Sequence, residues 1–158
     1  MLGDGLRIHD GVILDSSGAE IVLGEEVTIN PYCALRRIGG IRIGRDTGAG
    51  MHTTIVTFNH GIDDLNVPMM RQPMRGAGIS VGENVWIGAR CVILDGVIIG
   101  DGAVVAAAMV SRAVGREDVV AGVPARVIKN RRREAARRAA ASALPHENAC
   151  GHKNGVCQ

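Results

Sequence analysis

Large aliphatic residues recur at every sixth position through the middle of the chain, and smaller apolar residues recur four positions after them. One large and one small apolar residue within six, with polar residues or glycine between them, is the pattern of a short strand followed by a turn. A short period that persists is typical of a solenoid, and steps of six residues build a parallel β-helix. The large residues are Val81, Ile87, Ile93, Ile99 and Val105, and the smaller ones are Val85, Cys91, Val97, Ala103 and Met109.

The same pattern occurs upstream in two pieces. The first piece contains Leu23, Ile29 and Leu35, with Val27 and Cys33 in the smaller series. After a slip of two residues, which predicts a loop at a corner, the pattern resumes with Ile43, Thr47, Ala49, Thr53 and Ile55. The strands of an ordinary β-sandwich would not keep a six-residue phase for so long. We therefore predict an all-β solenoid, with its strands parallel.

Composition supports this fold class. The chain has 22 glycines and 46% hydrophobic residues but only 2% aromatic ones, so its core must consist of thin aliphatic layers. A length of 158 residues fits one domain. We expect the β-helix to occupy residues 1–130 and a basic tail to occupy residues 131–158. The tail begins with RRREAARRAAASA, for which we expect one or two helical turns, and it should be partly disordered beyond them.

The six-residue phase fails over residues 58–78, FNHGIDDLNVPMMRQPMRGAG. A solenoid that interrupts its own repeat contains an inserted loop, and such loops often carry function. His60 lies near the start of the interruption and is the best candidate for a general base, because histidine titrates near neutral pH. A histidine packed at a strand end is the structural alternative. Polar residues farther along this loop could touch a substrate or a neighbouring subunit, but we expect them to be solvated; they are Asp63, Asp64, Arg71 and Gln72.

The arginine cluster of the tail is a local feature, because the formal net charge is only +2. Tyr32, Phe58 and Trp86 are the only aromatic residues, and none interleaves with the arginines, so we do not expect a nucleic-acid partner. A solvated basic face is the simplest interpretation of the cluster. Contact between Arg131 and a phosphate-rich ligand is the alternative.

The amino-terminal sequence MLGDGLRIHDG lacks the basic and apolar regions of a secretory signal, and no apolar run is long enough to span a membrane. We therefore expect a cytoplasmic protein without membrane insertion. Cys33 and Cys91 fall at core positions, where a thiol acts as a small apolar group, so no disulfide is expected. A metal site is not expected either, since the spacing of four tail residues fits no established zinc pattern. These residues are His146, Cys150, His152 and Cys157.

Four motifs together resemble the hexapeptide-repeat acyltransferases, most closely the maltose, galactoside and polysaccharide O-acetyltransferases. They are NH at 59–60, VPMMRQP at 67–73, VGENVWIGARCVILDGVIIGDGAVV at 81–105 and VVAGVPARVIKNR at 119–131, and the likeness covers about residues 20–131. The resemblance implies a left-handed parallel β-helix that forms a homotrimer, with each active site between neighbouring subunits. It also implies transfer of an acetyl group from acetyl-coenzyme A (acetyl-CoA) to a hydroxyl group of a sugar or glycan-like acceptor.

The resemblance further implies a set of site residues. His60 is the catalytic base, and Asn30 and Asn59 contact the acceptor, although Asn30 is equally well explained as a turn residue. Residues that match the acetyl-CoA contacts are Ala89 and Ala107 along the pantetheine arm, Ser111 and Arg112 where the family usually has threonine and lysine, and Arg126 and Lys129 at the phosphates. Before Ser111 the sequence AAAMV is one residue shorter than in the family. The region from Arg36 to Ile38 replaces an acidic residue that contacts the sugar, and the amino-terminal helical segment of the maltose and galactoside enzymes has no counterpart here.

Two other functions share this fold. A γ-type carbonic anhydrase is a trimeric β-helix that binds zinc through three histidines, but His9, His52 and His60 do not reproduce its spacing. A noncatalytic trimeric scaffold would use the solenoid only as a surface. Neither explains the VPARVIK segment at residues 123–129.

Overall fold

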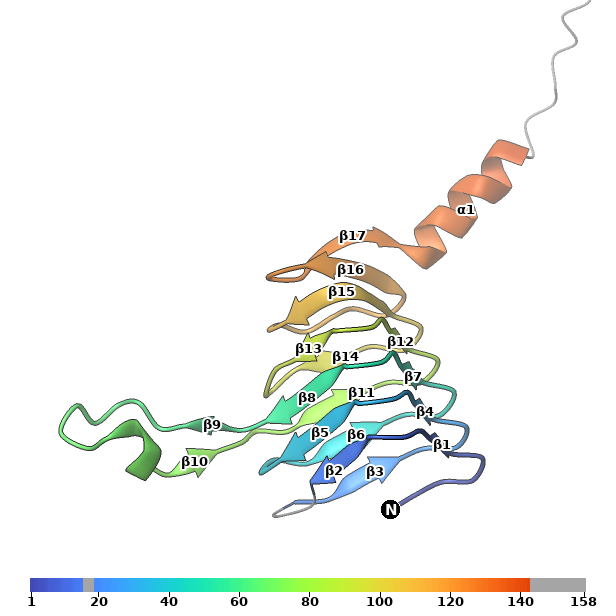
Figure 1. The fold of residues 1–158 in the computed structure, drawn as a ribbon. Helices are drawn as coiled ribbons and strands as arrows, with labels where there is room; N and C mark the ends of the chain where they lie inside the picture. Colours follow the sequence, from blue (N-terminus) through green and yellow to red (C-terminus); the bar gives the residue numbers. More distant parts are fainter. Residues whose placement is uncertain (16–18, 143–158) are drawn as a thin grey trace, which may run out of the picture.

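The computed structural model describes residues 1–15 and 19–142. Within these ranges the chain winds into stacked coils, and short parallel strands align on three faces of the stack (Figure 1). Face 1 contains β1 (Arg7–Ile8), β4 (Thr28–Ile29), β7 (Gly48–Ala49), β12 (Trp86–Ile87) and the start of β15 (Val104–Val110). Face 2 contains β2 (Ile13–Asp15), β5 (Ala34–Arg37), β8 (Thr54–Thr57), β13 (Val92–Ile93) and the end of β15. Face 3 contains β3 (Ile21–Leu23), β6 (Ile41–Ile43), β11 (Ile79–Val81) and β14 (Ile98–Ile99).

The six-residue pattern produces the core, as predicted. All five large residues from Val81 to Val105 are buried, and so are the upstream series. Thr47, Thr53 and Thr57 also point inward, and each hydroxyl donates a hydrogen bond to a backbone carbonyl of another coil, at 2.8 to 3.0 Å. Buried threonines therefore replace aliphatic residues without leaving a polar group unpaired.

The predicted six-residue register was wrong at one position. We predicted Met109 in the core, but Met109 is half-buried and Ala108 is buried instead. The turn before β13 uses four residues, 88–91, whereas β15 makes the same turn with 106–108, one residue fewer. Ala107 absorbs the difference with a φ of 40° at an irregularity in the β15–β16 pairing.

The two-residue slip lies where face 2 turns into face 3, at Gly39 and Gly40, as the pattern predicted for a corner. Glycine is required here because a Cβ on Gly39 would lie 2.4 Å from the backbone nitrogen of Gly78. A Cβ on Gly76 would likewise lie 2.0 Å from the carbonyl oxygen of Thr57. The slip thus makes room for the return of the inserted loop.

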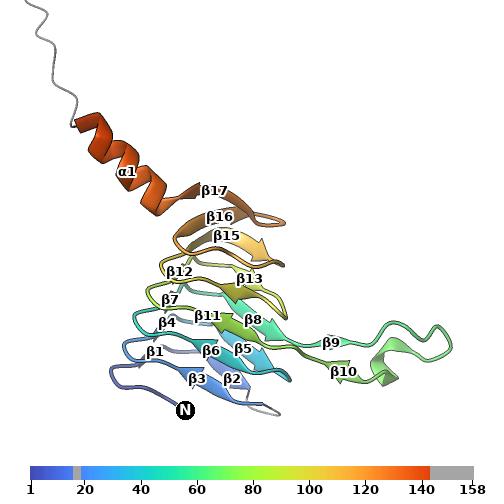
Figure 2. The ribbon, with the colours of Figure 1, turned by 180° about the vertical axis from the view of Figure 1, so that it is seen from behind.

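That inserted loop, residues 58–78, projects away from the β-helix, and we call it the arm (Figures 1 and 2). It leaves face 2 at the end of β8 and contains β9 (Asn59–His60), the short 3₁₀ helix η1 (Met69–Arg71) and β10 (Met74–Arg75). β9 and β10 pair in antiparallel fashion, with His60 opposite Met74. On its return, the backbone N–H groups of Ala77 and Gly78 donate to the carboxylate of Asp95 at 2.9 to 3.0 Å.

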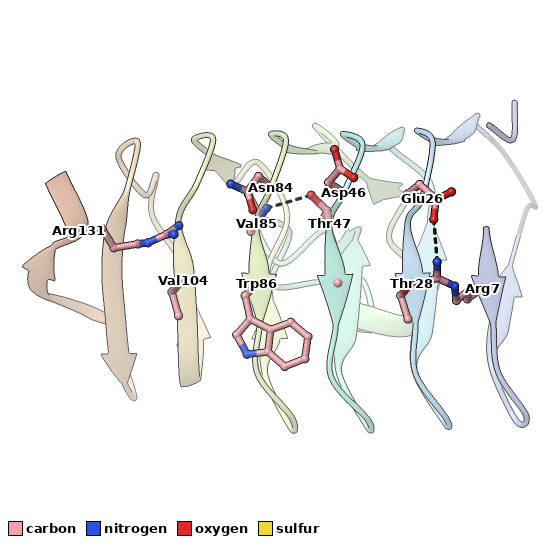
Figure 3. Close-up of a pocket in the computed structure, with 11 residues that line it drawn as sticks. Arg7, Glu26, Thr28, Asp46, Thr47, Asn84, Val85, Trp86, Val104 and Arg131 are labelled. Carbon is pink, nitrogen blue, oxygen red and sulfur yellow. Dashed lines mark hydrogen bonds and ion pairs between the residues drawn. The ribbon is translucent and has the colours of Figure 1, made fainter. Parts of the chain in front are cut away.

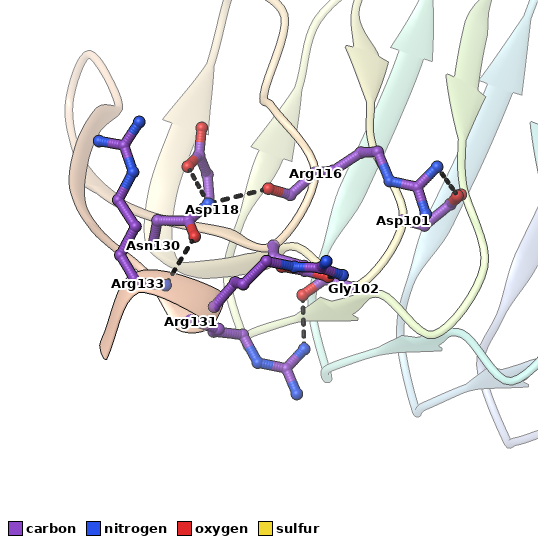
Figure 4. A network of polar contacts seen from close by, with 9 residues as sticks. Asp101, Gly102, Arg116, Asp118, Asn130, Arg131 and Arg133 are labelled. Carbon is purple, nitrogen blue, oxygen red and sulfur yellow. Dashed lines mark hydrogen bonds and ion pairs between the residues drawn. The ribbon is translucent and has the colours of Figure 1, made fainter. Parts of the chain in front are cut away.

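The last coil is covered by β16 (Asp118–Gly122) and β17 (Arg126–Asn130), and α1 (Arg131–Ser142) then leads away from the stack (Figure 2). The helix is longer than the one or two turns that we expected. Asn130 explains its start, because its side-chain oxygen accepts a hydrogen bond from the backbone N–H of Arg133 (Figure 4). Alanine and arginine, both strong helix formers, continue it.

Helix α1 is tied to the last coil through polar contacts. The Arg131 guanidinium donates to the Gly102 carbonyl, and Arg132 donates two hydrogen bonds to the Glu117 carboxylate. Arg131 therefore anchors the helix, which was not foreseen. The two cysteines and two histidines of the tail lie outside the described residues. No helix in the described ranges is long and apolar enough to cross a membrane.

Candidate active site

His60 lies at the base of the arm, three residues beyond the end of β8. Its ring is half-buried, and its Nδ1 atom is buried with no hydrogen-bond partner in the described part of the chain. A buried ring nitrogen without a partner is uncommon. His60 therefore has a ring nitrogen whose hydrogen-bonding capacity the described residues leave unused. Asn59 is exposed and lies opposite Arg75 in the hairpin.

Arg36 lies beside the base of the arm. Its guanidinium is 5.9 Å from the centroid of the Phe58 ring and 3.4 Å from the Asp15 carboxylate. This is the region in which the resemblance predicts the loss of an acidic sugar contact. Arg36 puts a positive charge close to the segment that carries His60.

A second group of candidate residues lies in the turns that lead from face 1 to face 2. These turns stack on one another, and we call the stack the first corner. It consists of residues 9–12, 30–33, 50–53, 88–91 and 106–108. Ala89 and Ala107 both lie on it, both are exposed, and they belong to successive coils. Small side chains leave the backbone of this corner open, as an extended ligand would require.

Asn30 also lies on the first corner, where its side-chain N–H group donates to the Ala49 carbonyl of the next coil at 2.9 Å. That bond is the one expected of a turn residue. Next to Asn30 the rings of Tyr32 and His52 stack with centroids 5.2 Å apart. The first corner therefore presents aromatic rings near Asn30 and exposed backbone near Ala89.

The turn between β16 and β17 packs on top of this corner. The backbone N–H of Ala125 donates to the Met109 carbonyl at 2.9 Å, which places the Val123–Pro124 turn over the coil that contains Ala107. Arg126 starts β17 and Lys129 lies near its end, and both are exposed. Ser111 and Arg112, also exposed, follow β15 on the far side of face 2. The candidate acetyl-CoA residues thus belong to the last two coils and the strands that cover them, but Ser111 and Arg112 lie at the arm end of face 2 and not on the first corner.

Within one chain, the first corner does not meet His60. Ala89 precedes β13 and His60 follows β8, and these strands are parallel neighbours on face 2, with Val92 opposite Thr54. The first corner and the arm consequently lie at opposite ends of the face 2 strands (Figure 1).

A further hollow was missed by sequence reasoning. An open groove of about 720 Å³ runs along the outer side of face 1, with the half-exposed Trp86 ring in the middle (Figure 3). Arg7 and Arg131 lie toward its two ends, and Gly48 lies beside the ring, where a Cβ would come within 2.9 Å of it. Trp86 precedes Ala89 by three residues, so this groove adjoins the first corner. The one available signal was a lone tryptophan in a chain with almost no aromatic residues.

The two cysteines in the described ranges have the surroundings expected of structural groups. Cys33 and Cys91 are buried as free thiols, and burial raises the pKa of both. His9 and His52 lie on the first corner and His60 on the arm. In residues 1–15 and 19–142, no three His, Cys, Asp or Glu side chains gather as a metal ion would need.

Comparison with known proteins identifies the class. The bacterial transferase hexapeptide family, described by six repeats, matches residues 78–108. WbbJ of Escherichia coli strain K12, assigned to O-acetyl transfer in lipopolysaccharide biosynthesis, is 32% identical over 136 residues, which cover 80% of this chain and 69% of WbbJ.

Solved structures agree. A maltose O-acetyltransferase from Clostridium difficile 630 superposes with a TM-score of 0.70 at 27% identity, over 81% of this chain and 67% of that one. The hexapeptide-repeat acetyltransferase VCA0836 from Vibrio cholerae O1 biovar eltor, solved with acetyl-CoA, gives a TM-score of 0.65 at 27% identity, over 80% of this chain and 71% of that one.

The chain belongs to the hexapeptide-repeat acyltransferase family, and its fold is the left-handed parallel β-helix of that family. It is an acetyltransferase that uses acetyl-CoA as the acyl donor. The enzyme class and the donor that the sequence indicated are thereby confirmed.

Proposed function

We propose that this enzyme transfers the acetyl group of acetyl-CoA to a hydroxyl group of a sugar or glycan-like acceptor, with His60 as general base, in a cleft between subunits of a homotrimer. The observation that carries the proposal is the position of His60. It lies on an arm that extends away from its own β-helix, and its buried Nδ1 lacks a partner within the described chain. A neighbouring subunit is the natural source of what is missing.

In the proposed reaction, a ring nitrogen of His60 removes the proton of the acceptor hydroxyl as its oxygen attacks the thioester carbonyl carbon. The tetrahedral intermediate collapses when the carbon–sulfur bond breaks, and the coenzyme A thiolate takes the proton from His60. A positioned base of this kind contributes about 10²- to 10⁴-fold to the rate. A backbone N–H of a nearby coil would stabilise the oxyanion.

The donor would lie along the first corner of one subunit. In this proposal Ala89 and Ala107 allow its pantetheine arm to approach the backbone. Arg126 and Lys129 hold the phosphates, for which fixed positive charge is suited, and Ser111 and Arg112 are further donor contacts. All four of these side chains are exposed.

The acceptor would bind between the arm of one subunit and the first corner of the next, with Asn30 and Asn59 as its contacts. A sugar is favoured because WbbJ is assigned to O-acetyl transfer in lipopolysaccharide biosynthesis and the Clostridium difficile enzyme is named for maltose. We also propose the cytoplasm as the compartment, since buried free thiols fit a reducing environment.

Release of coenzyme A in the presence of a panel of sugars, together with titration calorimetry of acetyl-CoA binding, tests the proposal. We expect His60→Ala to lower turnover by about a hundredfold or more and to leave acetyl-CoA affinity nearly unchanged, because the base contacts the acceptor and not the bulk of the donor. Arg126→Ala should weaken donor binding.

Glu25→Ala is the control and should be silent, because Glu25 is exposed in the turn between β3 and β4, away from both the arm and the first corner. Wild-type turnover by the His60→Ala variant would contradict the role of His60 as the base. Equal losses of turnover and donor affinity in His60→Ala would indicate a structural role instead.

A further inference from the structure

Gln72 is the one buried residue among those described in the arm. Its side chain is 8% exposed, whereas every other residue from 58 to 78 is half-buried or exposed, including the apolar Leu65 at 95%. The sequence led us to expect a solvated glutamine here, and the structure contradicts that expectation. The arm has no apolar core, so something else must fix its shape.

The side-chain amide of Gln72 supplies three hydrogen bonds to the backbone of the arm. Its Nε2 group donates to the carbonyl oxygens of Asp64 and Val67, at 2.8 and 2.9 Å, and its Oε1 atom accepts from the N–H of Asp64 at 3.3 Å. Both donors of the amide are thus used. These bonds fasten the outgoing half of the arm to the returning half.

Gln72 also lies against the residue that follows His60. A Cβ built on Gly61 would be 3.2 Å from both the Cβ and the Oε1 of Gln72. The carbonyl oxygen of the next residue, Pro73, accepts a hydrogen bond from the Gly61 N–H at 3.0 Å. Met74 then pairs with His60 in the hairpin. The amide is therefore connected to His60 through one residue on each strand.

We propose that Gln72 is a positioning residue for the acetyl transfer: its amide serves as the core of the arm and fixes the segment that presents His60. This inference rests on the proposed function of His60. Segments with few buried apolar contacts are the first to open locally, so an arm without the Gln72 bonds would sample many orientations of His60. A shift of about 1 Å in a catalytic group can cost about a hundredfold in rate.

Gln72→Glu is the sharpest test, because it keeps the shape of the side chain but places a carboxylate oxygen against the carbonyl oxygens of Asp64 and Val67. Arg71→Gln is the control: it changes the charge by the same amount one residue away, on an exposed side chain. We expect kcat of Gln72→Glu to fall by about tenfold to a hundredfold, while acetyl-CoA affinity and the Tm of the β-helix stay as in the wild type.

Amide hydrogen exchange gives a second readout that does not depend on activity. In Gln72→Glu the amides of Gly61 and Asp64 should exchange faster, and in Arg71→Gln they should not. Unchanged exchange, or faster exchange with normal kcat, would overturn the inference. If the wild-type enzyme transferred acetyl to no acceptor while Gln72→Glu still loosened the arm, the proposed function would fail and the part played by Gln72 in holding the arm would stand.

Discussion

At the scale of single residues, the coils touch so closely that glycine becomes a structural requirement at defined points. Gly50 is buried on the first corner directly beneath Gly88 and Ala89. A Cβ added to it would lie 2.6 Å from the backbone nitrogen of Ala89 and 2.7 Å from the carbonyl carbon of Gly88. Backbone atoms cannot move aside as the end of a flexible side chain can, so the coil above would have to shift.

Gly50→Ala is therefore expected to destabilise the protein by about 1–3 kcal/mol, the usual cost of overpacking. Gly40→Ala is the matched control, because a Cβ there would meet only the Glu20 carbonyl oxygen at an ordinary 3.6 Å. Thermal unfolding of both variants measures the difference. Equal Tm values would show that the coils are not packed as described.

At the scale of elements, α1 is stable only through its connections to the last coil, since none of its residues is buried. The closest ion pair joins Arg132 to Glu117. The hydrogen bond from Arg132 lowers the pKa of Glu117 below its ordinary value of 4.5, with smaller contributions from the charges of Arg132, Arg116 and Arg131. The same hydrogen bond raises the pKa of Arg132.

When folding lowers the pKa of a carboxyl group, the ionised group stabilises the folded state. This stabilisation is fully present above the unfolded-state pKa and is lost as the pH falls through the folded-state pKa. The helical signal of α1 in circular dichroism should thus be constant above about pH 5 and decline below about pH 4. In Glu117→Gln this acid-dependent part should be missing. The same decline in wild type and Glu117→Gln would mean that the pair does not hold the helix.

The elements that could be predicted are those that repeat. A period of six residues fixes which side chains point inward, so the core from Leu23 to Val105 followed directly from spacing. The errors occur where the repeat changes: at Ala107, where one residue fewer turns the corner, and at Asn130, where a cap starts a longer helix than expected. Neither the shorter turn at Ala107 nor the cap at Asn130 depends on hydrophobic periodicity.

The candidate site was predictable only in part for a related reason. His60 stood out because it lies where the period fails, but the burial of Gln72 results from contacts inside an aperiodic loop. Trp86 gave no pattern because its space comes from Gly48, which is 38 residues earlier and adjacent only in the folded coil. Contacts between distant coils become visible once the register of the strands is known.

At the scale of the whole molecule, one chain separates the parts that its proposed chemistry must combine. The first corner and the arm lie at opposite ends of face 2, and the arm extends outward from the stack. A closed ring of three subunits would place the arm of each beside the first corner of the next, so that one kind of contact generates three equivalent clefts. Each cleft would then take His60 from one chain and Ala89 from another.

Mixing two inactive variants tests this account most directly. His60→Ala removes the base, and Ala89→Trp blocks the first corner with a bulky side chain at an exposed position. If the site lies between subunits, trimers that assemble randomly from equal amounts should recover about a quarter of wild-type activity, because about one cleft in four receives both intact parts. Recovery near that level, in an oligomer of three times the chain mass, is the predicted result. No recovery from fully exchanged trimers would contradict it, because the site would then lie within a single chain.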